Sequence, residues 1–201
     1  NYEKFLASLP NSTNITKNVL YSTYKFTKED KKIGIACFNS AWRAFGEKDD
    51  YGKLILGERT IDQAINDLQN TDLRIGVIHH PIEYLQEWER IEVKRLIYSS
   101  FHFWLTGHTH EPEFTKIETF HENRIIAVTG STLYNSREYY NGYSVIEVST
   151  ENDSGRIHIR EYDDRGRQFT PATAYSNTDG IESFSLHCTE IFPRHVDLTI
   201  H

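Results

Sequence analysis

Two clusters of histidines are the residues best suited to chemistry in this sequence. His79-His80-Pro81 and Gly107-His108-Thr109-His110 each directly follow a short apolar segment. A neutral imidazole is the side chain that most often binds a transition metal. A His-x-His pair on a tight loop also lets its two rings diverge, so that each can face one of two neighbouring ions, and Gly107 allows a sharp bend before them. The two clusters therefore predict a metal site.

The segments around the histidines indicate how the two clusters are brought together. Residues 75–78 and 103–105 are predicted as short buried strands, and residues 87–99 between them as a helix. Strands joined by one helix run parallel, so their carboxyl ends meet at the same edge of a sheet. That edge is where open α/β sheets hold their ligands.

The segments before and after this unit predict a mixed fold. Residues 19–26 and 33–38 are predicted as two strands joined by a charged turn. Residues 61–68 have apolar side chains at helical spacing, and Thr60 with Gln63 forms a capping-box pattern at the start. Gly46 to Gly52 is predicted as an exposed loop. After residue 110 the apolar spacing changes to two, which predicts strands over four segments: 114–120, 125–128, 144–148 and 156–162.

This order of elements favours a sheet with helices outside, extended by antiparallel strands. We predict that residues 1–165 form the folded domain. Residues 166–201 are predicted to be a linker or tail with one possible strand near Phe184, because Pro, Ser, Asn and Gly gather after Gly166.

Composition excludes several classes of protein. The 201 residues carry 22 Lys and Arg against 29 Asp and Glu, a formal charge of −7. The chain therefore has no excess of positive charge with which to bind nucleic acid or an anionic membrane. The longest apolar runs fall short of the roughly 18 residues that a membrane span needs. Two cysteines make no disulfide framework. We therefore expect a cytoplasmic protein that binds no membrane.

The motifs themselves resemble the calcineurin-like metallophosphoesterase family. Ile78-His79-His80-Pro81 followed by Gly107-His108-Thr109-His110 looks like the C-terminal half of that family's metal-binding pattern. Asn39-Ser40-Ala41-Trp42 and Leu56-Gly57-Glu58-Arg59 resemble bacterial members often attached to larger signalling or defence ATPases. The likeness covers roughly residues 19 to 163.

The resemblance implies a fold, an activity and a set of ligands. The fold would be a double β-sandwich flanked by helices, of the α+β or α/β class. The activity would be hydrolysis of a phosphate ester, more specifically a phosphodiester, by attack of a hydroxide that bridges two divalent ions of Mn, Zn, Fe or Mg. His79 and His108 would bind one ion and His110 the other, whereas His80 would not be a ligand and would lie behind the ligands or at the rim of the site.

The sequence departs from the family in its N-terminal half. It contains no Asp-x-His, Gly-Asp-x-x-Asp or Gly-Asn-His-Asp/Glu motif. These would supply the remaining ligands, including the bridging carboxylate. We therefore expect either the C-terminal part of a longer protein, with further domains and no activity of this part alone, or a degenerate member of the family.

Two residues outside the histidine clusters are candidates for binding substrate. Asn39 ends a buried strand and is expected either to reach the substrate or to satisfy a turn. Arg137 lies in a Tyr-rich loop and suits phosphate oxygens, although such loops are more often simply solvated. A catalytically inactive scaffold or binding module with the same fold is the alternative to an enzyme.

Overall fold

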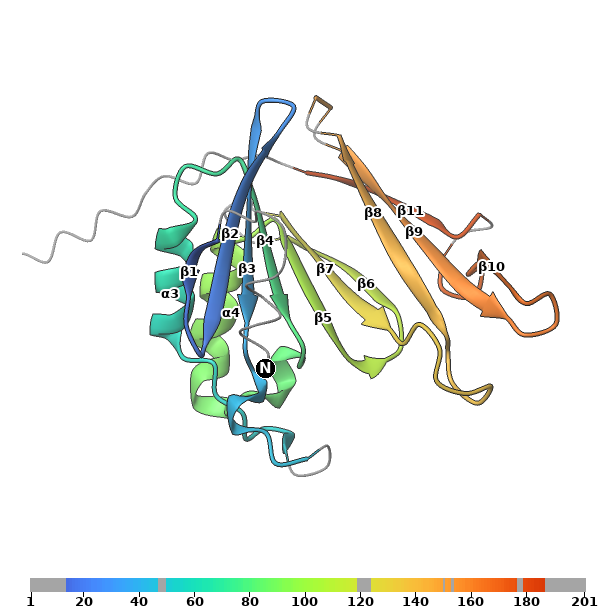
Figure 1. The fold of residues 1–201 in the computed structure, drawn as a ribbon, viewed down its shortest axis with the longest axis horizontal. Coiled ribbons are helices and arrows are strands. Elements are labelled where there is room, and N and C mark those ends of the chain that lie inside the picture. Colours follow the sequence, from blue (N-terminus) through green and yellow to red (C-terminus); the bar gives the residue numbers. More distant parts are fainter. Residues whose placement is uncertain are drawn as a thin grey trace, which may run out of the picture.

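The computed structural model describes residues 14–46, 50–118, 124–149, 151–152, 154–176 and 179–186, which form two sheets and one layer of helices (Figure 1). The elements in chain order are β1 (Asn14–Lys17), β2 (Tyr21–Lys28), β3 (Lys31–Phe38), η1 (Ala41–Arg43), α3 (Glu58–Asp67), β4 (Leu73–Ile78), η2 (Ile82–Tyr84), α4 (Glu87–Ser100), β5 (Phe103–His110), β6 (Glu113–Glu118), β7 (Arg124–Ser131), β8 (Gly142–Ser149), β9 (Ser154–Asp163), β10 (Gln168–Pro171) and β11 (Ile181–Ser185).

The larger sheet has seven strands with parallel strands at its centre. Its order is β1-β2-β3-β4-β5-β7-β6. The pairs β3–β4, β4–β5 and β5–β7 are parallel, whereas β1–β2, β2–β3 and β6–β7 are antiparallel. The predicted parallel unit with antiparallel extensions is therefore confirmed, and it sets the carboxyl ends of β3, β4 and β5 at one edge of the sheet.

The helices α3 and α4 cover one face of this sheet (Figure 1). The apolar face of α3 presents Ile61 and Ala64 to the core, and α4 adds Val93 and Ile97. The capping box predicted at Thr60 is wrong, because the helix begins one turn earlier, with Gly57 at its N-cap in a conformation of φ 83°. A glycine adopts that left-handed φ without steric cost.

The second sheet packs on the opposite face of the first. It consists of β8, β9, β10 and β11, and β9 pairs with the other three strands. Phe103 and Ile126 of the large sheet pack against Ile157, Ile159 and Phe184 of the small one in a second apolar core. The prediction of a mixed α/β fold with two packed sheets and flanking helices is confirmed.

The stretch predicted as a linker or tail contributes strands to the small sheet. Residues 168–171 and 181–185 form β10 and β11, both antiparallel to β9. The one strand expected near Phe184 is present as β11. The domain boundary after residue 165 stays a prediction.

No helix in the described part of the chain is long and apolar enough to cross a bilayer.

Candidate metal centre

The two histidine clusters lie together at the carboxyl edge of the parallel strands. His79 and His80 follow β4 directly, and His108 lies in the last half of β5. The backbone N–H of Gly107 donates a 3.0 Å hydrogen bond to the carbonyl oxygen of His79, which joins the two loops. The parallel pairing of β4 with β5 therefore brings residues 29 positions apart into one site, as the sequence predicted.

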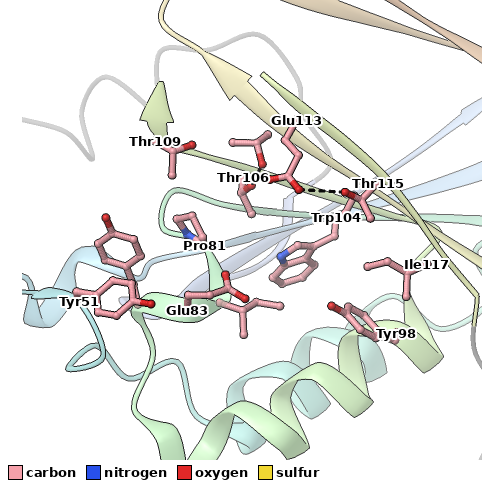
Figure 2. A pocket seen from close by; sticks show the side chains of 14 residues that line it. Tyr51, Pro81, Glu83, Tyr98, Trp104, Thr106, Thr109, Glu113, Thr115 and Ile117 are labelled. Atoms are coloured by element: carbon pink, nitrogen blue, oxygen red, sulfur yellow. Dashed lines mark hydrogen bonds between the residues drawn. The ribbon is translucent and has the colours of Figure 1, made fainter. Parts of the chain in front are cut away.

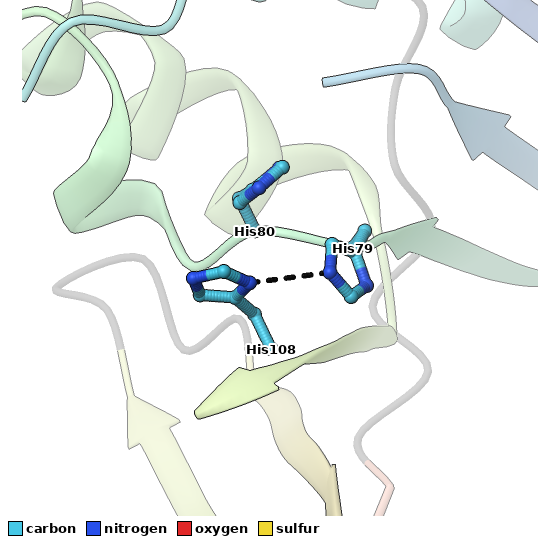
Figure 3. Close-up of side chains that lie close together, drawn as sticks. All are labelled: His79, His80 and His108. Carbon is cyan, nitrogen blue, oxygen red and sulfur yellow. Dashed lines mark hydrogen bonds between the residues drawn. The ribbon is translucent and has the colours of Figure 1, made fainter. Parts of the chain in front are cut away.

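Three imidazoles converge there (Figure 3). One nitrogen of each of His79, His80 and His108 lies within 4.8 Å of the other two. His79 Nε2 and His108 Nδ1 are 3.2 Å apart. Such spacing matches imidazoles that can share a single ion, because ligands at about 2 Å from a metal lie a few ångströms from each other.

His80 is held by a serine that lies just after the neighbouring strand β3. Its side chain is 4% exposed, and its Nδ1 lies 2.8 Å from Ser40 Oγ, which also accepts the backbone N–H of His80 at 3.3 Å. In the tautomer with the proton on Nδ1, this nitrogen donates to Ser40 Oγ, and the lone pair of Nε2 is available to an ion. A hydrogen bond of this kind fixes the tautomer and orientation of many metal-binding histidines.

The environment favours the neutral form of two of these imidazoles, His79 and His80. Burial, followed by the charges of His79 and His108, lowers the pKa of His80 to about 4, although the charge of Asp50 opposes this shift. Partial desolvation also lowers the pKa of His79, which stays exposed on one side, with further contributions from His108 and His110. A neutral imidazole is the form that binds a metal, so the site is prepared for a cation at neutral pH.

A buried carboxylate lies next to the histidines. Asp50 is 2% exposed, and its carboxylate accepts the backbone N–H groups of Phe45 at 2.7 Å and Gly46 at 3.0 Å. These hydrogen bonds, together with the positive charges that His80 and His108 can carry, lower the pKa of Asp50. The expectation of an exposed loop over residues 46–52 is therefore wrong at Asp50, while residues 47–49 lie outside the described residues.

The backbone of β5 is bent at the site. His108 has φ 72° and His110 has φ 60°, both in the left-handed region that residues other than glycine seldom adopt. The pairing of β5 with β7 is irregular between Thr106 and His110. Gly107 was expected to make the bend, but the left-handed residues are the histidines themselves.

The other predicted site residues lie around or beyond this cluster. His110 is exposed and outside the group of three, although its charge reaches His79. Asn39 donates from Nδ2 to the carbonyl oxygen of Val19 and accepts from the backbone N–H of Ala41, which is the turn role considered for it. Arg137, in the loop after β7, pairs with Asp164 at 3.4 Å. The metal role of His110 and the substrate roles of Asn39 and Arg137 stay predictions.

Sequence reasoning missed three contributors to the site. His80 was assigned to the rim, yet it belongs to the cluster. Ser40 holds its ring, and the ring of Tyr84 lies 4.6 Å from that of His108 and 5.6 Å from that of His80. The position of His80 next to His79 in the sequence was the one available signal for its place in the cluster.

The three clustered imidazoles are a donor set that could hold a metal ion. Three neutral imidazoles are the protein ligands of a common zinc geometry that keeps one position open, and imidazole also suits Fe, Cu and Ni. Asp50 adds negative charge close by. His79 is exposed and His108 partly so, which leaves the site accessible from solvent.

Comparison with known proteins adds only remote structural likenesses. No family model matches the chain, and no curated protein matches it. A hypothetical protein from Thermus thermophilus shares 12% identity at a TM-score of 0.44, over 90% of this chain and 69% of that one. Vps29 from Chaetomium thermophilum shares 12% identity at a TM-score of 0.31, over 83% of this chain and 61% of that one. A single mutant of Vps29 from Entamoeba histolytica shares 9% identity at a TM-score of 0.31, over 76% of this chain and 99% of that one.

Proposed function

We propose that the protein is a metal-dependent phosphoesterase of the cytoplasm, acting on a phosphodiester. The observation that carries the proposal is the convergence of His79, His80 and His108 at the carboxyl ends of parallel strands. The resemblance of the His-x-Pro and Gly-His-x-His motifs to metallophosphoesterases supports the choice of reaction. A divalent ion held there would supply an acidified water and neutralise charge on phosphoryl oxygens.

The chain's own residues have distinct parts in this proposal. His79, His80 and His108 hold the cation, and Ser40 fixes the ring of His80 through its 2.8 Å contact. Asp50 supplies a negative charge beside two of the imidazoles. The ring of Tyr84 packs against His80 and His108. The exposed side of His79 is where a phosphate ester would approach.

The number of ions is part of the proposal. The three clustered imidazoles provide for one ion. The motif resemblance implies two, and His110 is the residue assigned to the second. We propose one well-held ion at the cluster and a second whose ligands include His110.

The proposal is tested by hydrolysis of bis(p-nitrophenyl) phosphate by the natural full-length protein with Mn²⁺, Zn²⁺ or Mg²⁺. We expect metal-dependent release of nitrophenolate, and a loss of about 100-fold or more in the His108→Ala variant, because a ligand is removed. His158→Ala is the matched control, since His158 lies on the small sheet and contacts Glu147. Metal binding with no hydrolysis in the wild type would contradict the enzyme and favour the binding module.

A further inference from the structure

A pocket opens beside the histidine cluster on the helix-bearing face of the large sheet (Figure 2). Its volume is about 550 Å³, within the range of sites for small organic ligands. Pro81, which follows His80, and Thr109, which follows His108, belong to its wall, and so does Tyr84. The pocket therefore begins where the candidate metal site ends.

The wall of the pocket combines apolar surface with hydroxyl groups. Apolar surface comes from Ile82, Trp104, Ile117 and Ala127. Hydroxyls come from Tyr98 of α4 and from threonines on three adjacent strands, namely Thr106, Thr115 and Thr129. Thr106 Oγ1 and Thr129 Oγ1 are 2.9 Å apart and hold each other in place. Such a wall suits a ring-containing group with several polar atoms.

The charges that line the pocket are negative. Glu83 and Glu113 lie on its wall, and none of the described residues that line it is Lys, Arg or His. Glu113 accepts a 3.2 Å hydrogen bond from Thr115, and Glu83 pairs with Lys94 at 3.3 Å. An anion would be repelled here, whereas groups that donate hydrogen bonds find carboxylate acceptors.

Trp104 contributes a buried donor that has no partner among the described residues. Its side chain is 2% exposed, and its Nε1 makes no hydrogen bond. The ring is fixed by Phe38 and Phe101, with centroids 5.6 Å from each, and Figure 2 shows the indole nitrogen on the side that faces the pocket. The nitrogen itself is closed to solvent, so the indole offers a ligand its fixed apolar face and not a hydrogen-bond donor.

We propose that this pocket binds the uncharged alcohol part of the substrate, a nucleoside or a group of the same size with ring N–H and hydroxyl donors. The inference rests on the proposed function, because the phosphate of the same molecule would lie at the histidine cluster. A nucleobase edge carries both donors, for Glu83 and Glu113, and acceptors, for the hydroxyl groups of the wall such as that of Tyr98. The substrate class is then a nucleotide ester bound with its phosphate outside the pocket.

The test is calorimetric titration of the metal-free protein with adenosine, guanosine, cytidine and uridine. We expect at least one nucleoside to bind with a Kd of about 1 mM or tighter. Ala127→Leu, which places a larger side chain in the pocket, should weaken this binding at least about tenfold. Val145→Leu is the matched control, because Val145 is 50% exposed on the small sheet and should leave binding unchanged.

A second variant keeps the test informative if Ala127→Leu does not fold. Glu113→Gln replaces an exposed carboxylate, so folding is retained, and nucleoside binding should fall several-fold. Inorganic phosphate should not compete with the nucleoside, since no cationic side chain is found among the described residues of the wall. Absence of binding by all four nucleosides, competition by phosphate, or binding that neither variant changes would overturn the inference.

The outcome is separable from that of the proposed function. Hydrolysis of bis(p-nitrophenyl) phosphate involves no nucleoside and reports on the histidine cluster alone. Nucleoside binding without any metal-dependent hydrolysis would overturn the enzyme and leave the pocket assignment standing. Hydrolysis without nucleoside binding would overturn the pocket assignment and leave the enzyme standing.

Discussion

At the scale of single residues, the account depends on which imidazoles hold the ion. The structure groups His79, His80 and His108, whereas the sequence motif assigns His110 and leaves His80 at the rim. The two assignments differ in one histidine each. They make opposite predictions for two matched substitutions.

Replacing His80 by Gln should weaken binding of Zn²⁺ or Mn²⁺ at the cluster at least about tenfold, because it removes one of three ligands. His110→Gln should change the first, tightest binding event much less. Competition with a chromophoric chelator measures both affinities. A large loss in His110→Gln together with an unchanged affinity in His80→Gln would restore the motif assignment.

The histidine at position 102 gives a separate prediction on stability and pH. His102 is 8% exposed, its Nδ1 accepts the backbone N–H of Arg74 at 3.0 Å, and burial is the main reason that its pKa falls to about 4. Unfolded histidine titrates near its ordinary value of about 6.5. The unfolded state therefore binds the proton first as the pH falls. The stabilising effect of neutral His102 is full above about pH 6.5 and is lost as the pH falls towards about 4.

The expected size of this effect is about 3 kcal/mol across that window. His102→Asn keeps an acceptor for Arg74 but does not titrate. Urea unfolding at about pH 7 and pH 4.5 should show that the wild type loses up to about 3 kcal/mol more than the variant. Parallel losses in the two proteins would mean that His102 is protonated in the folded state as easily as in the unfolded one.

The residue scale also shows what sequence can and cannot predict. His79 and His108 were found because each follows a buried strand, which is a local pattern. The role of His80 depends on Ser40, forty positions earlier, and only the pairing of β3 with β4 brings the two together. Asp50 was placed in an exposed loop between two glycines, but its side chain is buried and accepts hydrogen bonds from the backbone N–H groups of Phe45 and Gly46.

At the scale of elements, one carboxylate joins the start of α3 to the start of α4. Glu89, in the first turn of α4, is fully buried, and its oxygens accept the backbone N–H groups of Leu56 and Gly57 at 2.9 Å each. Gly57 is the N-cap of α3, so the charge lies near two helix N-termini. Helix dipoles favour a negative charge at both places.

Glu89→Ala should lower the free energy of unfolding by about 3 kcal/mol, because two buried N–H groups lose a charged acceptor. Glu92→Ala on the same helix is the control, since Glu92 makes an exposed pair with Arg95 and should cost about 0.5 kcal/mol. Chemical denaturation measures both. Equal small losses would show that the carboxylate does not hold the two helices together.

Regular elements were the more predictable part of the fold. The apolar spacing of residues 61–68 and the buried run of residues 33–38 were enough for α3 and β3. The start of α3 was misplaced because Thr60 and Gln63 match a capping box, while Glu89 instead binds the free N–H groups near Gly57. A cap supplied by another helix leaves no local signal in the sequence.

At the scale of the whole molecule, the two sheets share one apolar core. Phe184 of β11 is 5% exposed and its ring lies 5.6 Å from that of Phe103 and 6.5 Å from that of Phe114. These contacts join the late strand to the large sheet. We expect both sheets to unfold together.

Phe184→Ala should lower the free energy of unfolding by about 3 to 4 kcal/mol and keep a single transition. Phe169→Ala, on a side chain that is 38% exposed, should cost less. Coincident fluorescence and circular-dichroism transitions test this directly. Two separate transitions, with only the weaker one shifted by Phe184→Ala, would make the small sheet a separate folding unit with its boundary between β7 and β8.

The central claim is that His79, His80 and His108 hold a divalent metal ion. Anomalous diffraction at the zinc edge, from crystals of the protein grown with Zn²⁺, tests it most directly. The account predicts one strong peak about 2.0 to 2.1 Å from a nitrogen of each of the three imidazoles. A peak elsewhere, or no peak at the cluster in crystals saturated with zinc, would contradict it.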